Sequence, residues 1–272
     1  MNSLQSMLFV PGNRPERFAK ALASGADSVC IDLEDAVPEA EKSSARAEAI
    51  DAIGSDLRFA VRINAVTTRH GLRDLLAIAE SAQRPKLIFL PMVEHAAEVV
   101  LASRAIGDYG VRFIPLIETV LGIENAGLIA ADPSVEMLML GGADLSAQLG
   151  VTLGWEPLML ARSQLVMAAA GAGKQAIDVP YIHIDDEKGL VEESRRAKAL
   201  GFAAKAAIHP AQIASIHSVF RPTAAEVAEA EDAELAFAAA KGAAVRFKGK
   251  MLEAPVMARY RQILSLKDKV DA

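Results

Sequence analysis

The amino-acid sequence predicts a (β/α)8 barrel followed by a helical extension. Eight short apolar runs alternate with segments of helical periodicity along the chain. Several runs are continuously apolar, which is typical of parallel strands covered on both faces. Eight β-then-α units are the arithmetic of a (β/α)8 (TIM) barrel. A doubly wound sheet usually has fewer strands and often a glycine-rich dinucleotide turn, which the first expected strand lacks.

Each expected strand is followed by a helical segment. Pro15 opens the first helix where a missing N–H costs nothing, and Gly25 closes it. The expected strands are Met7–Val10, Ser28–Leu33, Arg58–Ile63, Lys86–Leu90, Arg112–Ile117, Glu136–Leu140, Gln175–Val179 and Ala203–Ile208. The later helices are expected over Glu39–Gly54, Gly71–Ala82, Glu94–Gly107, Thr119–Ala131, Pro157–Gly171, Asp185–Gly201 and Pro210 to about Phe220.

The extension begins after the eighth unit. Residues 1–220 are assigned to the barrel and residues 221–272 to the extension. An Ala- and Glu-rich helix opens the extension, because Val227, Ala230 and Phe237 share one face. Since it follows a complete barrel, the extension is expected to pack on the barrel or on a neighbouring subunit.

Composition excludes several classes of protein. The 272 residues are 52% hydrophobic with one cysteine, which excludes disorder and a disulfide scaffold. Cys30 is interpreted as a buried thiol in a reducing compartment. With 29 Lys and Arg against 35 Asp and Glu, the net charge of −6 argues against nucleic-acid binding. No apolar run approaches the roughly 20 residues of a membrane span, and the first residues lack signal-peptide features, so a cytoplasmic location is expected.

Candidate site residues are sought where apolar runs end, because chemistry in such barrels sits at the carboxyl ends of the strands. The polar residues found there are Arg14, Asp32, Glu34, Asp35, Arg62, Asn64, Glu94, Glu118, Asp144, Asp178 and His209. Gathered in one site, the carboxylates would repel one another and their pKa values would rise. A bound divalent cation would remove that problem.

Glu118 and Asp144 form the best ligand pair. Each follows its own expected strand, and their separation (144 − 118 = 26 residues) is one β/α repeat. The two carboxylates are therefore expected on neighbouring strands at the same end. Two oxygen ligands, with other positions left to water and substrate, are the usual Mg²⁺ arrangement. The alternative is that both residues are helix caps.

The cationic candidates leave alternatives open. The Arg62 fork suits a carboxylate or thioester oxygen, but it also suits a structural ion pair with Glu34 or Asp35. Arg14 precedes a helix N-terminus that attracts anions, or it is a solvated loop residue. Lys205 could form a Schiff base, although a single lysine in an apolar strand is weak evidence for one.

In combination these segments resemble the citrate lyase β-subunit-like branch of the HpcH/HpaI aldolase family. The resemblance runs in order from about residue 7 to residue 266. It is carried by Leu8–Phe18, Gly25–Asp27, Ile31–Pro38, Val61–Asn64, Ile117–Thr119, Gly142–Leu145, Ala176–Asp178 and Ala207–Pro210.

The resemblance implies a trimeric or hexameric barrel with Mg²⁺ held by Glu118 and Asp144. Family members cleave, or form, a C–C bond in a hydroxy-carboxyacyl thioester such as a citryl, citramalyl or malyl thioester. Arg62 is implied to bind substrate beside the metal, and the Arg14 segment is implied to help hold the acid or CoA. Arg14, Arg62, Asn64 and Glu118 are the expected substrate-binding residues.

Two positions depart from the family pattern. Glu253 stands where the family usually has an Asp, lent by a neighbouring subunit for acid/base chemistry, and Met92 stands where the family often has Lys. A misplacement of about 1 Å can cost on the order of a hundredfold in rate. Glu253 and Arg62 remain the expected catalytic residues.

The sequence thus predicts a Mg²⁺-dependent carbon–carbon lyase acting through an enolate-like intermediate on an acyl thioester of CoA or an acyl carrier. A homo-oligomer is expected, without nucleic-acid or membrane partners. Three alternatives remain: a Schiff-base aldolase using Lys205, a β subunit active only in a multi-chain lyase complex with an acyl carrier, and a degenerate ligand-binding barrel.

Overall fold

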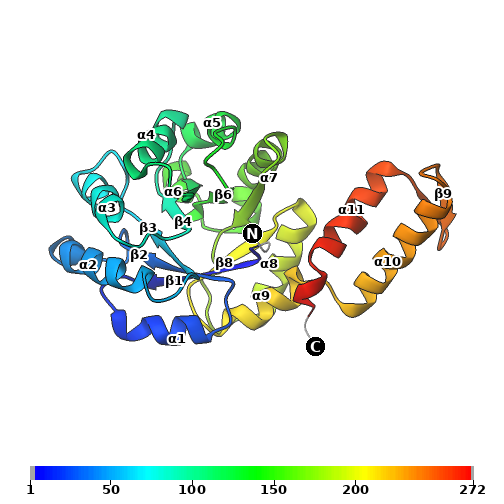
Figure 1. The fold of residues 1–272 in the computed structure, drawn as a ribbon, viewed down its shortest axis with the longest axis horizontal. Coiled ribbons are helices and arrows are strands. Elements are labelled where there is room, and N and C mark those ends of the chain that lie inside the picture. The colour runs from blue at the N-terminus through cyan, green and yellow to red at the C-terminus, as the bar shows by residue number, and fades with distance from the viewer. Residues whose placement is uncertain (1–3, 271–272) are drawn as a thin grey trace. The chain divides into compact units, whose positions relative to one another are not determined.

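A computed structural model describes residues 4–270, and eight parallel strands in it close into a barrel (Figure 1). The strands pair in chain order, and β8 returns to β1 with Ala207 opposite Leu8. The predicted (β/α)8 barrel is confirmed, and every expected strand is found. Their bounds are β1 Ser6–Pro11, β2 Ser28–Asp32, β3 Phe59–Arg62, β4 Leu87–Leu90, β5 Arg112–Ile117, β6 Met137–Leu140, β7 Gln175–Asp178 and β8 Ala204–Ala207.

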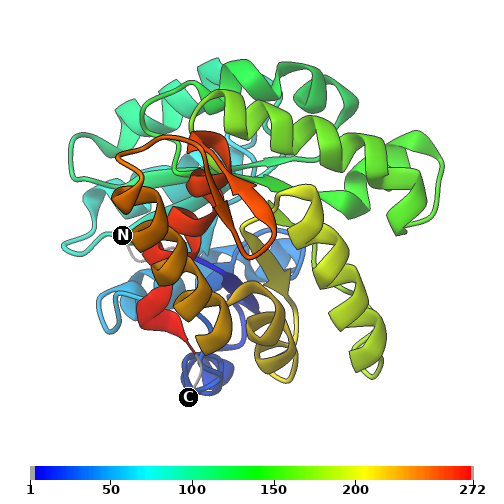
Figure 2. The same cartoon turned by 90° about the vertical axis from the view of Figure 1, so that its right-hand side faces the viewer.

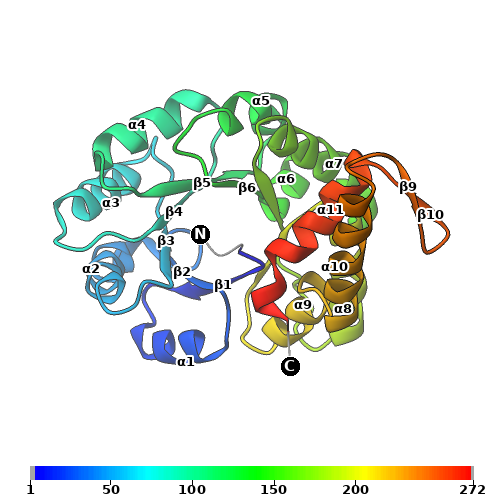
Figure 3. The same cartoon turned by 45° about the vertical axis from the view of Figure 1, so that its right-hand side comes forward.

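Helices alternate with the strands and surround them (Figure 3). The α-helices are α1 Phe18–Ala23, α2 Lys42–Ile53, α3 Arg69–Glu80, α4 Ala96–Ile106, α5 Val120–Ala130, α6 Gly142–Leu149, α7 Trp155–Gly171, α8 Glu187–Leu200 and α9 Gln212–Phe220. Two 3-10 turns, η1 Pro15–Arg17 and η2 Glu39–Glu41, precede α1 and α2. The sequence analysis missed α6, because its eight residues directly after β6 are too few to show a clear helical period.

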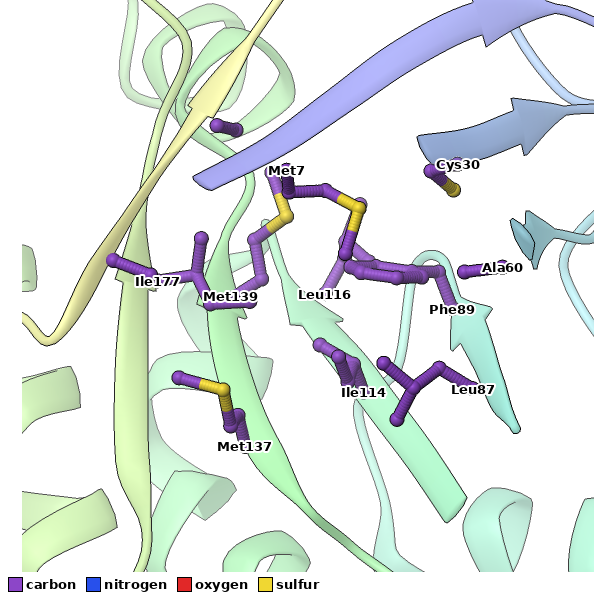
Figure 4. Close-up of a cluster of buried hydrophobic side chains, with 12 residues drawn as sticks. Met7, Cys30, Ala60, Leu87, Phe89, Ile114, Leu116, Met137, Met139 and Ile177 are labelled. Carbon is purple, nitrogen blue, oxygen red and sulfur yellow. The ribbon is translucent and has the colours of Figure 1, made fainter. Parts of the chain in front are cut away.

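Alternation along the strands decides what the barrel interior contains. Met7, Phe89, Leu116 and Met139 belong to a buried cluster to which all eight strands contribute (Figure 4). Successive side chains of a strand point to opposite faces, so the residue two positions further on also points inward. The apolar cluster therefore fills the barrel, and the next inward position of each strand lies at the carboxyl end.

The opposite alternation buries a separate ion-pair network between the sheet and the helices. Lys205 lies between two interior alanines, so its side chain leaves the barrel, where Nζ lies 2.7 Å from Asp178 Oδ2 and 2.8 Å from Glu193 Oε1. Arg162 Nε on α7 donates to Asp178 Oδ1 at 2.8 Å. Because Lys205 is 0% exposed and fully paired, the structure contradicts the Schiff-base alternative, and Asp178 also lies outside the site.

The chain divides into two compact units within α9, at residues 4–216 and from residue 217 onward. The second unit contains α10 Ala224–Ala239, α11 Ala254–Ser265, the terminal 3-10 turn η3 Lys267–Lys269 and the antiparallel strands β9 Val245–Phe247 and β10 Lys250–Leu252 (Figure 2). The sequence analysis did not foresee the hairpin.

The second unit has its own small core and a tight hairpin turn. Phe237, Leu252 and Met257 are buried together. Lys248 and Gly249 connect β9 to β10, both with positive φ (45° and 81°), as a two-residue hairpin turn requires. Within residues 4–270, no helix combines the length and apolar character needed to cross a membrane.

The buried network predicts how stability depends on pH. Burial by itself would raise the pKa of Asp178, but the charges of Lys205 and Arg162 outweigh it and hold that pKa below its usual value. A lowered folded-state pKa gives stability that is present above the unfolded pKa, about 3.9, and is lost as pH falls through the folded pKa. Asp178→Asn should therefore lower the free energy of unfolding at pH 7 by about 3–5 kcal/mol, and by less in acid.

Urea unfolding at pH 7 and at pH 2.5, below the unfolded pKa, measures this effect. Asp56→Asn is the matched control, because Asp56 pairs with Arg58 at 2.8 Å on the surface. Exposed pairs contribute about 0–1 kcal/mol. Equal losses in the two variants at pH 7 would contradict the assigned role of the network.

Candidate active site at the carboxyl end of the barrel

A cavity of about 460 Å³ opens at the carboxyl ends of the strands. Four carboxylates line it, and Arg62 is the one cationic side chain among the described residues of its wall. The carboxylates are Asp32, Asp35, Glu118 and Asp144, and the apolar wall includes Phe9, Leu116, Met139, Leu153, Val179, Pro180, Ile182 and Ile208. The wall of the site therefore combines an excess of acidic side chains with many apolar ones.

The charged residues enter the cavity because of strand alternation. Asp32, Arg62 and Glu118 each lie two positions beyond an interior residue of their own strand, which are Cys30, Ala60 and Leu116. Register places Asp32 opposite Arg62 across β2 and β3. Two oppositely charged side chains that face inward from paired positions are within contact distance.

Arg62 forms a two-bond fork with Asp32. Nε donates to Asp32 Oδ1 at 2.7 Å and Nη2 to Oδ2 at 2.6 Å. Nη1 lies 2.8 Å from Glu34 Oε2, at ion-pair distance without hydrogen-bond alignment, and 3.4 Å from Asp35 Oδ2. Burial would lower the pKa of Arg62, but Asp32, Glu34 and Asp35 raise it above its usual value, so the guanidinium stays charged. Arg62 thus forms the ion pairs with Glu34 and Asp35 that were one expectation for it, and it also lines the cavity, which was the other.

Glu118 is held by backbone groups from two neighbouring strand ends. It is 3% exposed, and Oε1 accepts a hydrogen bond from Met92 N at 2.5 Å, just after β4. Beyond β6, a Cβ on Gly141 would lie 2.2 Å from Glu118 Oε2, so only glycine leaves room for this carboxylate. Burial, with repulsion from Asp144 and Asp35, raises the pKa of Glu118 to about 7, against the opposing effects of Met92 N and Arg62.

Asp144 reaches the cavity from the first turn of α6. It is therefore a helical residue rather than the strand-end residue or N-cap expected from the sequence. The helix begins directly after β6, so Asp144 still faces the same cavity as Glu118.

The loop between β2 and α2 adds further negative charge. Asp32 accepts hydrogen bonds from Glu34 N at 2.9 Å and Ala36 N at 3.2 Å, which folds the loop back over the strand end. Burial raises the pKa of Glu34 to about 8, with contributions from Asp35, Glu118 and Asp32 and against the charge of Arg62. Carboxylates with pKa values near or above 7 are the expected result of several anions around one cation.

The donor set at the cavity fits a hard divalent cation. The carboxylates of Glu118 and Asp144 both line the cavity, and the missing Cβ of Gly141 gives the Glu118 carboxylate its room. Over residues 4–270 no group of three or more His, Cys, Asp and Glu side chains forms a metal cage. Mg²⁺ is commonly bound through one or two carboxylates with water and substrate completing its octahedron, so two ligands suffice for it.

Other predicted residues lie elsewhere. Arg14 is exposed at the start of η1 and is absent from the cavity wall. Both ends of the Asn64 amide have protein partners: Nδ2 donates to Asp74 Oδ2 at 2.7 Å, and Oδ1 accepts from Lys42 Nζ at 2.6 Å. Asn64 therefore holds the end of β3 in place instead of facing a substrate. Glu253 belongs to the second unit, where it precedes α11 with an exposed side chain.

Sequence reasoning missed several supporting groups. The Met92 amide that binds Glu118 belongs to a residue with left-handed backbone (φ 54°), and methionine, unlike glycine or asparagine, does not indicate such a position in a sequence. Glu94 and His209 follow strands but do not line the cavity. For Lys42 the sequence offered one signal, its place at the beginning of an expected helix, where the helix dipole disfavours a positive charge.

Comparison with known proteins agrees with this geometry. The family model described as HpcH/HpaI aldolase/citrate lyase matches residues 5–210. A citrate lyase subunit beta-like protein of Mycobacterium tuberculosis is 39% identical over 266 residues, covering 94% of this chain and 93% of that protein. A mitochondrial citramalyl-CoA lyase of Rattus norvegicus is 31% identical over 289 residues, covering 96% of this chain and 85% of that protein.

A solved structure of CitE from Mycobacterium tuberculosis, in complex with magnesium, acetoacetate and coenzyme A, matches with a TM-score of 0.81. Its sequence is 36% identical, and the match covers 97% of this chain and 98% of that one. The chain belongs to the HpcH/HpaI aldolase/citrate lyase family, as the motifs predicted. The predicted class, a carbon–carbon lyase of a magnesium-dependent family, is confirmed with it.

Gly141→Ala should disturb the metal site without touching a charged residue. The added Cβ would displace the Glu118 carboxylate, so Mg²⁺ affinity should fall by about tenfold or more, in the range seen when a ligand's supporting partners are changed. Calorimetric titration of the purified protein with Mg²⁺ measures the affinity. Gly127→Ala on α5 is the control, since its Cβ would meet nothing within 4 Å. Unchanged affinity in Gly141→Ala would show that the glycine has no such role.

Proposed function

We propose that this chain is a Mg²⁺-dependent lyase that cleaves or forms a C–C bond in a hydroxy-carboxyacyl thioester, such as citryl-, citramalyl- or malyl-CoA. The observation that carries the proposal is the shared cavity of Glu118, Asp144 and Arg62. In this proposal Glu118 and Asp144 would supply two oxygen ligands for a divalent cation in the same cavity as a guanidinium that stays charged. The magnesium and coenzyme A named for the CitE structure, and the activity named for the citramalyl-CoA lyase, support the same assignment.

Glu118 and Asp144 are the residues that would hold Mg²⁺ in this proposal. Bound there, Mg²⁺ would supply Lewis-acid polarisation of the substrate oxygens, a contribution of several kcal/mol. The buried position of Glu118 beneath the cavity orients its carboxylate before any ligand arrives, because Met92 N and Gly141 fix it. Less reorganisation is then needed when substrate binds.

Arg62 would stabilise the negative charge that develops on the thioester oxygen as it becomes enolate-like. Its fork with Asp32 holds the guanidinium plane in one orientation, and Phe9 lies 5.3 Å from Cζ beneath it. A charge donor fixed in advance is worth more than one that must be ordered during the reaction. The apolar side of the cavity, including Leu153 and Val179, would limit access of water to the reacting carbon.

We further propose that the protein forms a homotrimer or hexamer in which Glu253 of one subunit transfers the proton in the active site of its neighbour. Support comes from the sequence motif around Glu253 and from its exposed carboxylate, which makes no capping hydrogen bond at the start of α11. A carboxylate without a structural partner is available for acid/base work.

A thioester panel tests the proposed reaction. The purified chain, given Mg²⁺ and citryl-, citramalyl- or malyl-CoA, should release the two fragments of at least one substrate, detected by mass spectrometry. Glu118→Gln and excess EDTA should each reduce the rate by about a hundredfold or more, as expected for loss of an essential charge-stabilising group. Glu136→Gln is the control, because Glu136 pairs with Arg112 near the amino ends of the strands.

The outcomes separate the alternatives. Full activity of Glu118→Gln or in EDTA would refute the metal role. Activity only on a thioester attached to an acyl-carrier protein would favour a subunit of a multi-chain lyase. No cleavage of any of these thioesters would favour a degenerate ligand-binding barrel.

Metal binding should depend on pH through Glu118. A raised carboxyl pKa means that the folded protein holds the proton more tightly, so without metal the stability falls as pH rises from about 4.3 towards 7. Mg²⁺ must displace that proton below pH 7 but not above it. The increase in Tm caused by Mg²⁺ should therefore be larger at pH 8 than at pH 6, as measured by calorimetry. Equal increases at both pH values would contradict this linkage.

A further inference from the structure

We propose that Lys42 is a positioning residue that fixes the β2–α2 loop (residues 33–38) and the end of β3 around Arg62. The proposal rests on the function proposed above, since it assigns Lys42 a part in presenting the same site. Lys42 does not line the cavity, and it reaches the site only through the groups it holds.

The ammonium of Lys42 is satisfied by three acceptors from two different segments. Nζ donates to Leu33 O at 3.1 Å, to Glu34 O at 3.0 Å and to Asn64 Oδ1 at 2.6 Å. An ammonium group has three donors, so all are used. One side chain thus ties the start of α2 to the β2–α2 loop and to the residues that follow β3.

The Asn64 acceptor is itself anchored. Asp74 Oδ2 accepts from both Asn64 N at 2.9 Å and Asn64 Nδ2 at 2.7 Å, and Asp74 Oδ1 accepts from Arg46 Nε at 2.5 Å. Asp74 and Asn64 are buried. Lys42 therefore connects the loop to Asn64, which is itself held by Asp74 on α3 and, through Asp74, by Arg46 on α2. Hydrogen bonds to charged groups of this kind are about twice as strong as those between neutral groups.

The tethered loop carries the groups that surround Arg62. The Glu34 carbonyl is one of the Lys42 acceptors, and the carboxylates of Glu34 and Asp35 flank Arg62 Nη1. Asp35 and Ala36 also form part of the cavity wall. Release of this loop would change the cavity wall and the charge around Nη1, while the fork between Arg62 and Asp32 would remain.

Helix stability does not explain a lysine at this position. Lys42 is the first residue of α2, where the helix dipole favours an anion and disfavours a cation by about 0.3–1 kcal/mol. Local preferences are commonly violated at functional sites, where another requirement decides the residue. The three acceptors supply that requirement.

Two variants and a matched control test the proposal. Lys42→Met keeps the length of the side chain and removes its donors, and Lys42→Arg keeps a charged donor. Arg112→Met is the control, since Arg112 also joins two segments through Glu136 Oε2 and Val135 O, both at 3.0 Å, but near the amino ends of the strands. Each variant is assayed for kcat and KM with the best thioester of the panel, and for amide hydrogen exchange over residues 33–38.

We expect Lys42→Met to raise KM by about tenfold or more with a smaller change in kcat, because the cavity wall moves while the Arg62–Asp32 fork persists. Exchange of the amides of residues 33–38 should become faster. Lys42→Arg should recover part of both effects, and Arg112→Met should show neither.

An unchanged KM in Lys42→Met, or an equal KM change in Arg112→Met, would overturn the proposal. Exchange over residues 33–38 is readable without any activity. If the wild-type protein cleaves no thioester, the proposed function fails. Unchanged exchange in Lys42→Met would by itself refute the positioning role. Should Lys42→Met not fold, Lys42→Gln, which removes the positive charge and shortens the side chain, carries the same comparisons.

Discussion

The site depends on one buried cation among several carboxylates. Arg62 holds Asp32, Glu34 and Asp35 together, and without its charge these groups would repel one another and Glu118. Burial, together with repulsion from the neighbouring carboxylates, raises the pKa values of Glu34 and Glu118, which is an energetic cost for the protein without metal. That cost is the physical reason to expect a divalent cation, because a bound cation relieves the repulsion and binds more tightly for it.

The barrel contains two sets of ion pairs between basic and acidic side chains, and the alternation of side chains along the strands places one inside the barrel and the other outside it. Arg62 and Asp32 point inward and meet at the cavity, whereas Lys205 and Asp178 point outward and are buried against α7 and α8. A shift of one residue would exchange the two faces. The outward network is paired within the protein and contributes to stability, while Glu118 and Asp144 line the cavity together with the inward pair.

Backbone and supporting groups give the site its geometry. Met92 N, the absent Cβ of Gly141 and the ammonium of Lys42 all act at the ends of neighbouring strands or in the loops after them. None of these groups needs to touch a substrate. They fix the position of groups that do, and small displacements of such groups have large effects on rate.

The sequence by itself determined the barrel and its eight strands and indicated that Glu118 and Asp144 lie at the same end of it, because hydrophobic period and repeat spacing are local properties. It also pointed to Arg62, which closes an apolar run. The tertiary structure alone decided that Asn64 is occupied by Asp74 and Lys42, that Arg14 stays outside the cavity and that Lys205 is sealed in an ion-pair network. Those outcomes depend on which strand face a side chain takes and on partners ten or more residues away, and neither is written in a local pattern.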